Sequence, residues 1–251
     1  MKVFSKGTLN TFDWFLIIGI ILCSLIYALL SLPTVESGSL SPAGYATHIA
    51  KHFDFIGFIA GVTGVVCVVL TAKRSIANYI FGIVNVSLYA IISYKSQIYG
   101  DAALNALYYF PMQFIGWHQW VKNNDGKNRE GNNDESFVKA KRMTQKERLF
   151  FFACCTIVVV SVGYILGRYT ADPQPYKDSF TTVLSIAAMY LMVKAYMEQW
   201  MLWVMINAVS VIMWCMVFTR GDAHAGLMVI MWIFYLMNSI NGLRIWLKAS
   251  E

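Results

Sequence analysis

Residues 201–218 read MLWVMINAVSVIMWCMVF, an apolar run in which Asn207 and Ser210 stand out as polar residues. A run of about 20 apolar residues is long enough to cross a bilayer as a helix. The chain has eight such runs, at 11–31, 52–71, 76–94, 102–121, 149–169, 179–195, 199–218 and 224–246. Only 14% of its residues are charged, whereas soluble domains carry about 25%. The sequence therefore predicts an all-α polytopic membrane protein.

The positive charges are spread unevenly along the chain. If the N-terminus is cytoplasmic, eight spans return the C-terminus to the same side, and 15 of the 20 Lys and Arg residues then lie in inner segments. This is the positive-inside bias. The net charge of +6 is therefore explained by the orientation of the chain in the membrane, and nucleic acid is not an expected partner. Trp120 and Trp246, next to Lys122 and Lys248, fit an interfacial aromatic belt.

An internal repeat predicts the architecture. Features recur in the same order in both halves: an aromatic residue four before an Asn (Phe81 and Asn85; Trp203 and Asn207), a Gly-Asp pair (Gly100-Asp101; Gly221-Asp222) and a Tyr-Gly-Trp-Lys pattern (Tyr109, Gly116, Trp120 and Lys122; Tyr235, Gly242, Trp246 and Lys248). Residues 52–121 and 179–248 are therefore expected to be two three-helix repeats. The linking helix at 149–169 gives them the same orientation, a 3+1+3 plan with parallel repeats as in SWEET-type carriers.

The remaining segments fall outside this plan. Residues 1–51 are expected to form one extra N-terminal transmembrane helix and an outer loop. Residues 122–148 are polar, Asn/Gly-rich and basic, so they are expected to form a mobile cytoplasmic loop.

Amide and aromatic side chains share helix faces inside the spans. Residues four apart on a helix are neighbours, which places Trp203 beside Asn207. A lone Asn in a membrane helix is often glue between helices, but here the amides follow aromatic residues in stripes along three spans. The candidate substrate-binding residues are Asn85, Tyr109, Gln113, Trp117, Trp203, Asn207, Asn238 and Asn241.

The residue types at these positions indicate the chemistry of a ligand. Carboxamides offer both donors and acceptors to an uncharged polar group, and Trp and Tyr faces suit a flat ring, particularly a cationic one. A phosphate would call for Lys, Arg or a helix N-terminus. The interiors of the predicted spans lack Lys, Arg, Asp and Glu, which disfavours a phosphorylated substrate and ion-driven transport.

Two other classes of function fit the sequence less well. A membrane enzyme would need a nucleophile, base or metal cluster facing a cavity, and none is visible, so neither catalytic residues nor a cofactor are expected. His48 and His52 have the spacing of a metal pair but lack the Glu of His-Glu-x-x-His, so no metal site is predicted. A signalling or scaffold protein would use the loop 122–148, and would lose its partner if that loop were deleted, whereas a carrier would still bind its ligand.

The 3+1+3 plan, Gln113-x-x-x-Trp117-x-x-Trp120, Trp203-x-x-x-Asn207 and the Gly-Asp helix starts together resemble the PnuC family of bacterial vitamin transporters, over about residues 52–248. The resemblance implies facilitated diffusion of an unphosphorylated vitamin across the bacterial inner membrane. A cytoplasmic kinase would then trap the substrate by phosphorylation. Members that carry nicotinamide riboside are the most similar, and a carrier of thiamine or riboflavin stays the alternative, since the fold does not fix the substrate.

The resemblance and the residue types together suggest roles at the site. Gln113 and Asn207 would bind a carboxamide, Trp117 and Trp203 would pack on the ring or ribose, and Asn238 and Asn241 would bind hydroxyls. Asn85 mirrors Asn207, and Tyr109 continues the stripe of Gln113. Loss of the Asn207 side chain is expected to weaken binding without unfolding the protein. The sequence is also compatible with a homo-oligomer.

Overall fold

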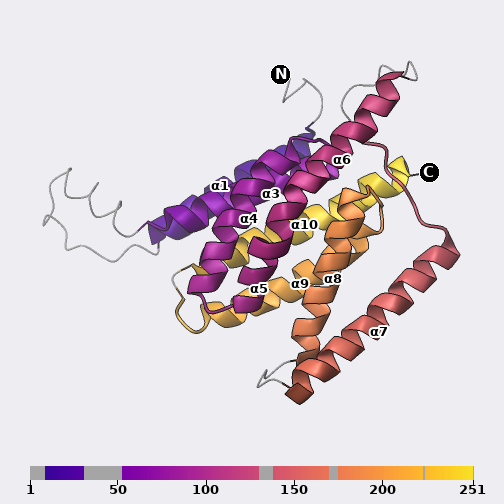
Figure 1. The fold of residues 1–251 in the computed structure, drawn as a ribbon. Coiled ribbons are helices and arrows are strands. Elements are labelled where there is room, and N and C mark those ends of the chain that lie inside the picture. The colour runs from indigo at the N-terminus through magenta and orange to yellow at the C-terminus, as the bar shows by residue number, and fades with distance from the viewer. Residues whose placement is uncertain (1–8, 31–52, 130–137, 170–174, 223, 251) are drawn as a thin grey trace, which may run out of the picture.

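The structure, a computed structural model, describes residues 9–30, 53–129, 138–169, 175–222 and 224–250 (Figure 1). Its elements are α1 (Thr11–Leu30), α3 (Phe55–Ala72), α4 (Asn78–Lys95), α5 (Tyr99–Ala103), η1 (Leu104–Tyr109), α6 (Phe110–Arg129), α7 (Gln145–Tyr169), α8 (Pro175–Val193), α9 (Gln199–Phe218) and α10 (Ala225–Ala249). Each apolar run falls on a helix, and the run 102–121 is shared by α5, η1 and α6. Most of the expected outer loop, with His48 and His52, lies outside the described residues.

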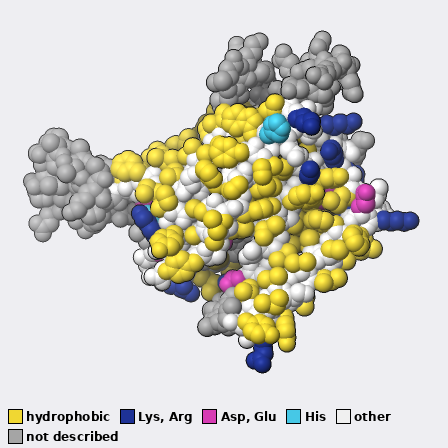
Figure 2. All heavy atoms as spheres, in the orientation of Figure 1, with side chains coloured by type: hydrophobic (Ala, Val, Ile, Leu, Met, Phe, Trp, Pro, Cys, Tyr) yellow, Lys and Arg dark blue, Asp and Glu magenta, His cyan; other side chains and the backbone are white. Residues whose placement is uncertain are grey.

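The exterior of the molecule suits a lipid environment. By length and composition, α3, α7, α9 and α10 can each cross a membrane. Helix α7 is the extreme case, because it is strongly apolar and yet only 11% of its most apolar window is buried. Figure 2 shows hydrophobic side chains over most of one face of the molecule. An apolar exterior of this extent is covered by lipid or by another chain and not by water.

The helices are described here in two groups that follow the chain, α3 to α6 and α8 to α10, and the two groups pack on each other. In the first group α3 packs on α4, and α4 packs on α5, η1 and α6; in the second group α9 packs on α8 and α10. Contacts of α10 with α3, and of α6 with α8, join the groups. Helix α1 lies on α3 and α10, and α7 packs on α8 beside the second group (Figure 1).

One end of the bundle is held by buried ion pairs and is called the basic end here. Helices α3, α6, α8 and α10 finish at this end and α1 begins there (Figure 1). Lys73 Nζ, just after α3, lies 2.7 Å from Oδ2 of Asp13, whose side chain is fully buried. Asp13 and Asn10 also form reciprocal bonds between side chain and backbone, a capping box that begins α1. These contacts fix the start of α1 to the end of α3.

Four buried rings close the basic end, and we call Tyr79, Trp120, Trp200 and Trp246 the aromatic cluster. Each is at most 2% exposed. Nε1 of Trp120 donates to the Met192 carbonyl of α8 and Nε1 of Trp246 donates to the Ala72 carbonyl of α3, both at 3.1 Å. Each Trp therefore bonds the first helix of the opposite group. The belt expected from their Lys neighbours is wrong for both residues, because lipid does not reach either ring.

A short strap of chain, residues 138–143, crosses the basic end. Val138 N donates to the Arg74 carbonyl at 3.3 Å, and Lys141 N donates to the Ala195 carbonyl at 2.8 Å. Arg74 and Ala195 follow the first helices of the two groups, and both have a φ of 59°. Helix α6 continues to Arg129, so helix and strap occupy parts of the stretch 122–148 that the sequence assigned to a loop.

The opposite end is tied by a titratable pair, which predicts a pH dependence. His224 Nδ1 lies 2.6 Å from Oδ2 of Asp54, and Asp54 Oδ1 caps α3 by accepting from Gly57 N. The hydrogen bond to Asp54 raises the pKa of His224. A raised pKa means that folding favours the protonated ring, so the pair stabilises fully below the ordinary value of about 6.5 and this contribution is lost as pH rises through the raised pKa.

We expect the melting temperature of the wild-type protein to fall, relative to His224→Gln, as the pH is raised from about 6 to about 9. Thermal unfolding of both proteins across this range measures the difference. Parallel curves would show that the pair contributes nothing to stability.

Candidate functional site

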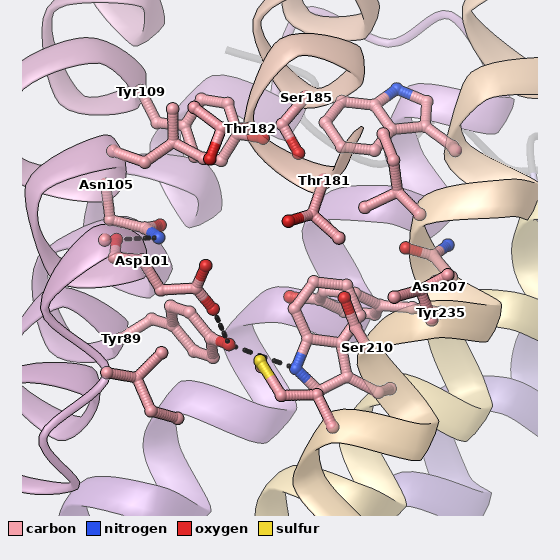
Figure 3. A pocket seen from close by; sticks show the side chains of 18 of the residues that line it. Tyr89, Asp101, Asn105, Tyr109, Thr181, Thr182, Ser185, Asn207, Ser210 and Tyr235 are labelled. Carbon is pink, nitrogen blue, oxygen red and sulfur yellow. Dashed lines mark hydrogen bonds between the residues drawn. The ribbon is translucent and has the colours of Figure 1, made fainter. Parts of the chain in front are cut away.

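A cavity of about 710 Å³ lies between the two helix groups (Figure 3). Its lining begins at Gln97, between α4 and α5, and at Lys177 near the start of α8. It ends at Met192 and at Trp200, which belongs to the aromatic cluster. The cavity therefore runs from the end opposite the basic end down to a floor of aromatic side chains. Its size is in the range of sites for small organic ligands.

The first wall is built by an irregular helix. Element η1 is a π-helix of 6 residues, a rare form that is frequent at functional sites. Its wider turn keeps residues at steps of four on one face, and Asp101, Asn105, Tyr109 and Gln113 all line the cavity. Asn105 Nδ2 donates to the Asp101 carbonyl at 2.9 Å, which ties the π-helix to α5.

Gln113 carries an unused acceptor at the cavity. The residue is 4% exposed, and its Oε1 has no hydrogen-bond partner within the part of the chain that the structure describes. Gly82 of α4 leaves the space that this amide occupies, since a Cβ there would collide with Oε1. A buried acceptor without a partner is costly, and the Gln113 side chain lines the cavity, so a ligand that brings a donor to this amide would relieve the cost.

The opposite wall comes from α9. Trp203 and Asn207 both line the cavity, one turn apart. The ring of Trp203 lies 6.3 Å from that of Tyr109, centroid to centroid, so the two groups share an aromatic wall. Asn207 Nδ2 donates to Ser239 Oγ at 2.5 Å, and its amide oxygen is turned towards the cavity (Figure 3). This oxygen is an acceptor opposite the first wall.

Asn85 also lines the cavity, with its amide held by the protein. Its Nδ2 donates to the Ala60 carbonyl of α3 at 2.9 Å, and its Oδ1 accepts from the Tyr235 hydroxyl at 3.2 Å. Asn85 thus connects α3, α4 and α10 at the wall. Both of its strong bonds are internal, so it shapes the cavity more than it offers free polar atoms.

Three predicted residues do not line the cavity. Trp117 is 38% exposed on the outside of α6, because each step of four residues overshoots an α-helical turn by about 40°. Asn238 is fully buried and donates to the Val68 carbonyl of α3 at 2.8 Å, which is the role of glue between helices. Asn241 lies two steps of three from Tyr235, about 120° around the helix.

Several polar residues that line the cavity were not among the candidates predicted from the sequence. They are Asp101 and Asn105 on the first wall, Thr181, Thr182 and Ser185 on α8, Ser210 on α9, and Tyr235 and Ser239 on α10 (Figure 3). Thr181 and Ser185 are one turn apart and Ser210 follows Asn207 by three residues, so helical spacing was a signal for these. Asp101 is the Asp of the repeated Gly-Asp pair, which indicated the repeat and the family resemblance but not a place in the site.

Charged side chains gather at one end of the cavity. Lys177, Asp178 and Arg220 line it where α8 begins and just after α9 ends. Lys177 Nζ and Asp178 Oδ1 are 3.6 Å apart and both side chains are exposed. The lining around Gln113 and Asn207 contains no Lys or Arg among the described residues. The deep part of the cavity is therefore built from amides, hydroxyls and rings.

Known proteins match most of the chain. The sequence profile of the family described as nicotinamide mononucleotide transporter covers residues 54–248. The nicotinamide riboside transporter PnuC of Neisseria mucosa is 35% identical, over 79% of this chain and 74% of the relative, and that of Haemophilus influenzae is 31% identical, over 79% and 81%. A crystal structure of the vitamin B3 transporter PnuC superposes with a TM-score of 0.75 at 28% identity, over 96% of this chain and 92% of that one. These relatives are transporters and not enzymes. The chain therefore belongs to the nicotinamide mononucleotide transporter family, which includes the PnuC proteins that its motifs resemble.

Proposed function

We propose that this protein carries nicotinamide riboside across the bacterial inner membrane by facilitated diffusion. The observation that supports this most strongly is the pair of amide side chains in the cavity lining, Gln113 with an Oε1 that lacks a partner and Asn207 with an Oδ1 turned towards the cavity, next to the Tyr109–Trp203 wall. A carboxamide on a flat ring can donate to these acceptors while its ring lies against the aromatic side chains. Hydroxyl groups of Thr181, Ser185 and Ser210 also line the cavity, where they would contact a ribose. The Thr181 hydroxyl donates to backbone carbonyls of α8, so it would serve as an acceptor.

The cavity favours the riboside over the mononucleotide named in the family description. A phosphate is normally bound by Lys, Arg or a helix N-terminus. Lys177 and Arg220 lie at the open end, and Lys177 is paired with Asp178. A phosphate attached to a ligand that reaches Gln113 would have to be satisfied by hydroxyls alone. The unphosphorylated form avoids this cost, and a cytoplasmic kinase would trap it after entry.

The two helix groups are well suited to act as parallel repeats in a 3+1+3 plan, with α7 as the linking helix and α1 added at the N-terminus. In the first group Tyr79 packs edge-on against Trp120, and in the second Trp200 packs against Trp246 in the same way. The turns that contain Arg74 and Ala195 share one conformation. We place the basic end, and both termini, in the cytoplasm because Lys and Arg gather there.

Transport by these groups would alternate access to the cavity. In the conformation described here the aromatic cluster and the strap close the cytoplasmic end. Opening that end would separate Trp120 from α8 and Trp246 from α3, which breaks the bonds that cross between the groups. The exposed apolar face of α7 is available for lipid or for a second copy of the chain.

Facilitated diffusion can be tested in vesicles that contain the purified protein. We expect radiolabelled nicotinamide riboside to equilibrate with the vesicle interior and not to concentrate there. Dissipating proton and sodium gradients should leave the initial rate unchanged. Accumulation that depends on either gradient would replace facilitated diffusion by coupled transport, without altering the substrate.

A further inference from the structure

Asp101 is a carboxylate in the cavity wall, and the mechanism above does not use it. It belongs to α5, lines the cavity, and points into the space between α5 and the helices α8 and α9 (Figure 3). Asn207 lies on the far side of the same space. A carboxylate is the most strongly hydrated group of such a lining, so its placement at a membrane cavity calls for a role.

The hydrogen bonds around Asp101 fix its carboxylate as an acceptor. Tyr89 OH lies 3.1 Å from Asp101 Oδ2, and Nε1 of Trp214 and Nε1 of Trp232 donate to the Tyr89 oxygen at 2.7 and 3.2 Å. Indole nitrogens only donate, and a phenol has a single proton. Because both indoles occupy the acceptor sites of Tyr89, its proton is directed at Asp101. Burial of Asp101 opposes its ionisation, and the hydrogen bond donated by Tyr89 acts in the other direction by stabilising the carboxylate.

The carboxylate of Asp101 forms no direct ion pair with another described residue. Lys177 and Asp178 face it from α8, pair with each other, and act on it in opposite directions. Only one oxygen of Asp101 is used by Tyr89, and the other faces the cavity (Figure 3).

We propose that Asp101 makes the cavity selective for a positively charged aromatic ring. The inference rests on the proposed function, since the ring of nicotinamide riboside is a pyridinium cation. That ring has no ionisable N–H, so its attraction to Asp101 is between charges and not a hydrogen bond. Charges interact more strongly in a cavity between membrane helices than in water, and the aromatic faces of Tyr109 and Trp203 add to the preference for a cation.

The test compares two ligands of almost the same shape. Reduced nicotinamide riboside keeps the carboxamide and the ribose, but its dihydropyridine ring is neutral. Calorimetric titration of wild-type protein and of Asp101→Asn with both ligands gives a ratio of affinities for each protein. The Asn oxygen still accepts from Tyr89, so only the charge is removed. We expect Asp101→Asn to bind the cation about tenfold more weakly, equal to 1.4 kcal/mol, and to bind the neutral ligand as the wild type does.

Two further variants serve as controls. Asp222→Asn makes the same change of charge just after α9, at the same end of the molecule but outside the cavity lining, and its side-chain oxygen can still accept from His224 N; we expect it to leave the ratio unchanged within twofold. Asp101→Glu keeps the charge and should retain most of the preference for the cation. If Asp101→Asn lost affinity equally for both ligands, or lost affinity for neither, the inference would be overturned. The proposed substrate would remain in place. Failure of the wild type to bind nicotinamide riboside would instead reject the proposed function.

Discussion

Replacement of Asn207 by Ala is expected to weaken binding of nicotinamide riboside by about 10- to 100-fold, as a lost hydrogen bond to a buried partner implies. The substrate carboxamide would lose the acceptor that α9 presents to it. Folding should be little affected, because Ser239 Oγ still donates to the Tyr235 carbonyl at 2.8 Å. Calorimetric titration measures the affinity, and thermal unfolding of the same preparation measures the stability.

Asn238→Ala is the matched control, since it removes the same side chain from a neighbouring helix. Asn238 bonds the Val68 carbonyl and does not line the cavity. We expect the Asn238→Ala variant to lower the free energy of unfolding by about 0.6–1.7 kcal/mol. Its affinity for nicotinamide riboside should stay within twofold of that of the wild type. The opposite pattern, with Asn207→Ala unstable and Asn238→Ala unable to bind, would reverse the roles given to the two residues.

Gly242→Ala is expected to lower the free energy of unfolding by about 3 kcal/mol, at the upper end for an overpacked core. A Cβ on Gly242 would lie 2.6–2.7 Å from ring atoms of Trp200. The indole is rigid, 2% exposed, and packed against Trp246, so it has no free space into which to move. The variant should therefore displace the cavity floor as well as destabilise the protein. Thermal unfolding measures the loss, and tryptophan fluorescence reports the displaced ring.

Gly61→Ala is the control for glycine removal from an apolar helix. Its new Cβ would meet its nearest neighbours at 3.9–4.0 Å, an ordinary contact. We expect unchanged or slightly raised stability, because Ala favours a helix over Gly. Equal melting temperatures for the two variants would show that the packing of Trp200 against Gly242 does not contribute to stability.

The helices could be predicted from the sequence because a bilayer imposes a long apolar run on every span. The predicted helix ends differ from the observed ones where polar residues line the cavity. Asp101 was placed outside the run 102–121, yet it lies inside α5. Lys177 and Asp178 likewise precede the expected run at 179 but belong to α8. Hydropathy detects contact with lipid and not the wall of a cavity.

The candidate site could be predicted only in part because helix faces were inferred from steps of three and four. A step of four held for Trp203 and Asn207 and, across the π-helix, for Tyr109 and Gln113, which all line the cavity. From Phe110 onward the helix is α, and by Trp117 the steps of four have rotated the side chain out of the site. No sequence pattern signalled the π-helix. The bonds of Trp120 and Trp246 to the opposite helix group depend on tertiary packing, which spacing does not reveal.

The measurement that tests the central claim most directly is calorimetric titration of the purified wild-type protein with nicotinamide riboside, nicotinamide mononucleotide and thiamine. The site described here predicts tight binding of the riboside and no measurable binding of the other two. Tight binding of the mononucleotide would contradict the conclusion that an amide-and-aromatic cavity without deep Lys or Arg excludes a phosphate. Tight binding of thiamine alone would keep the carrier but give it a different vitamin.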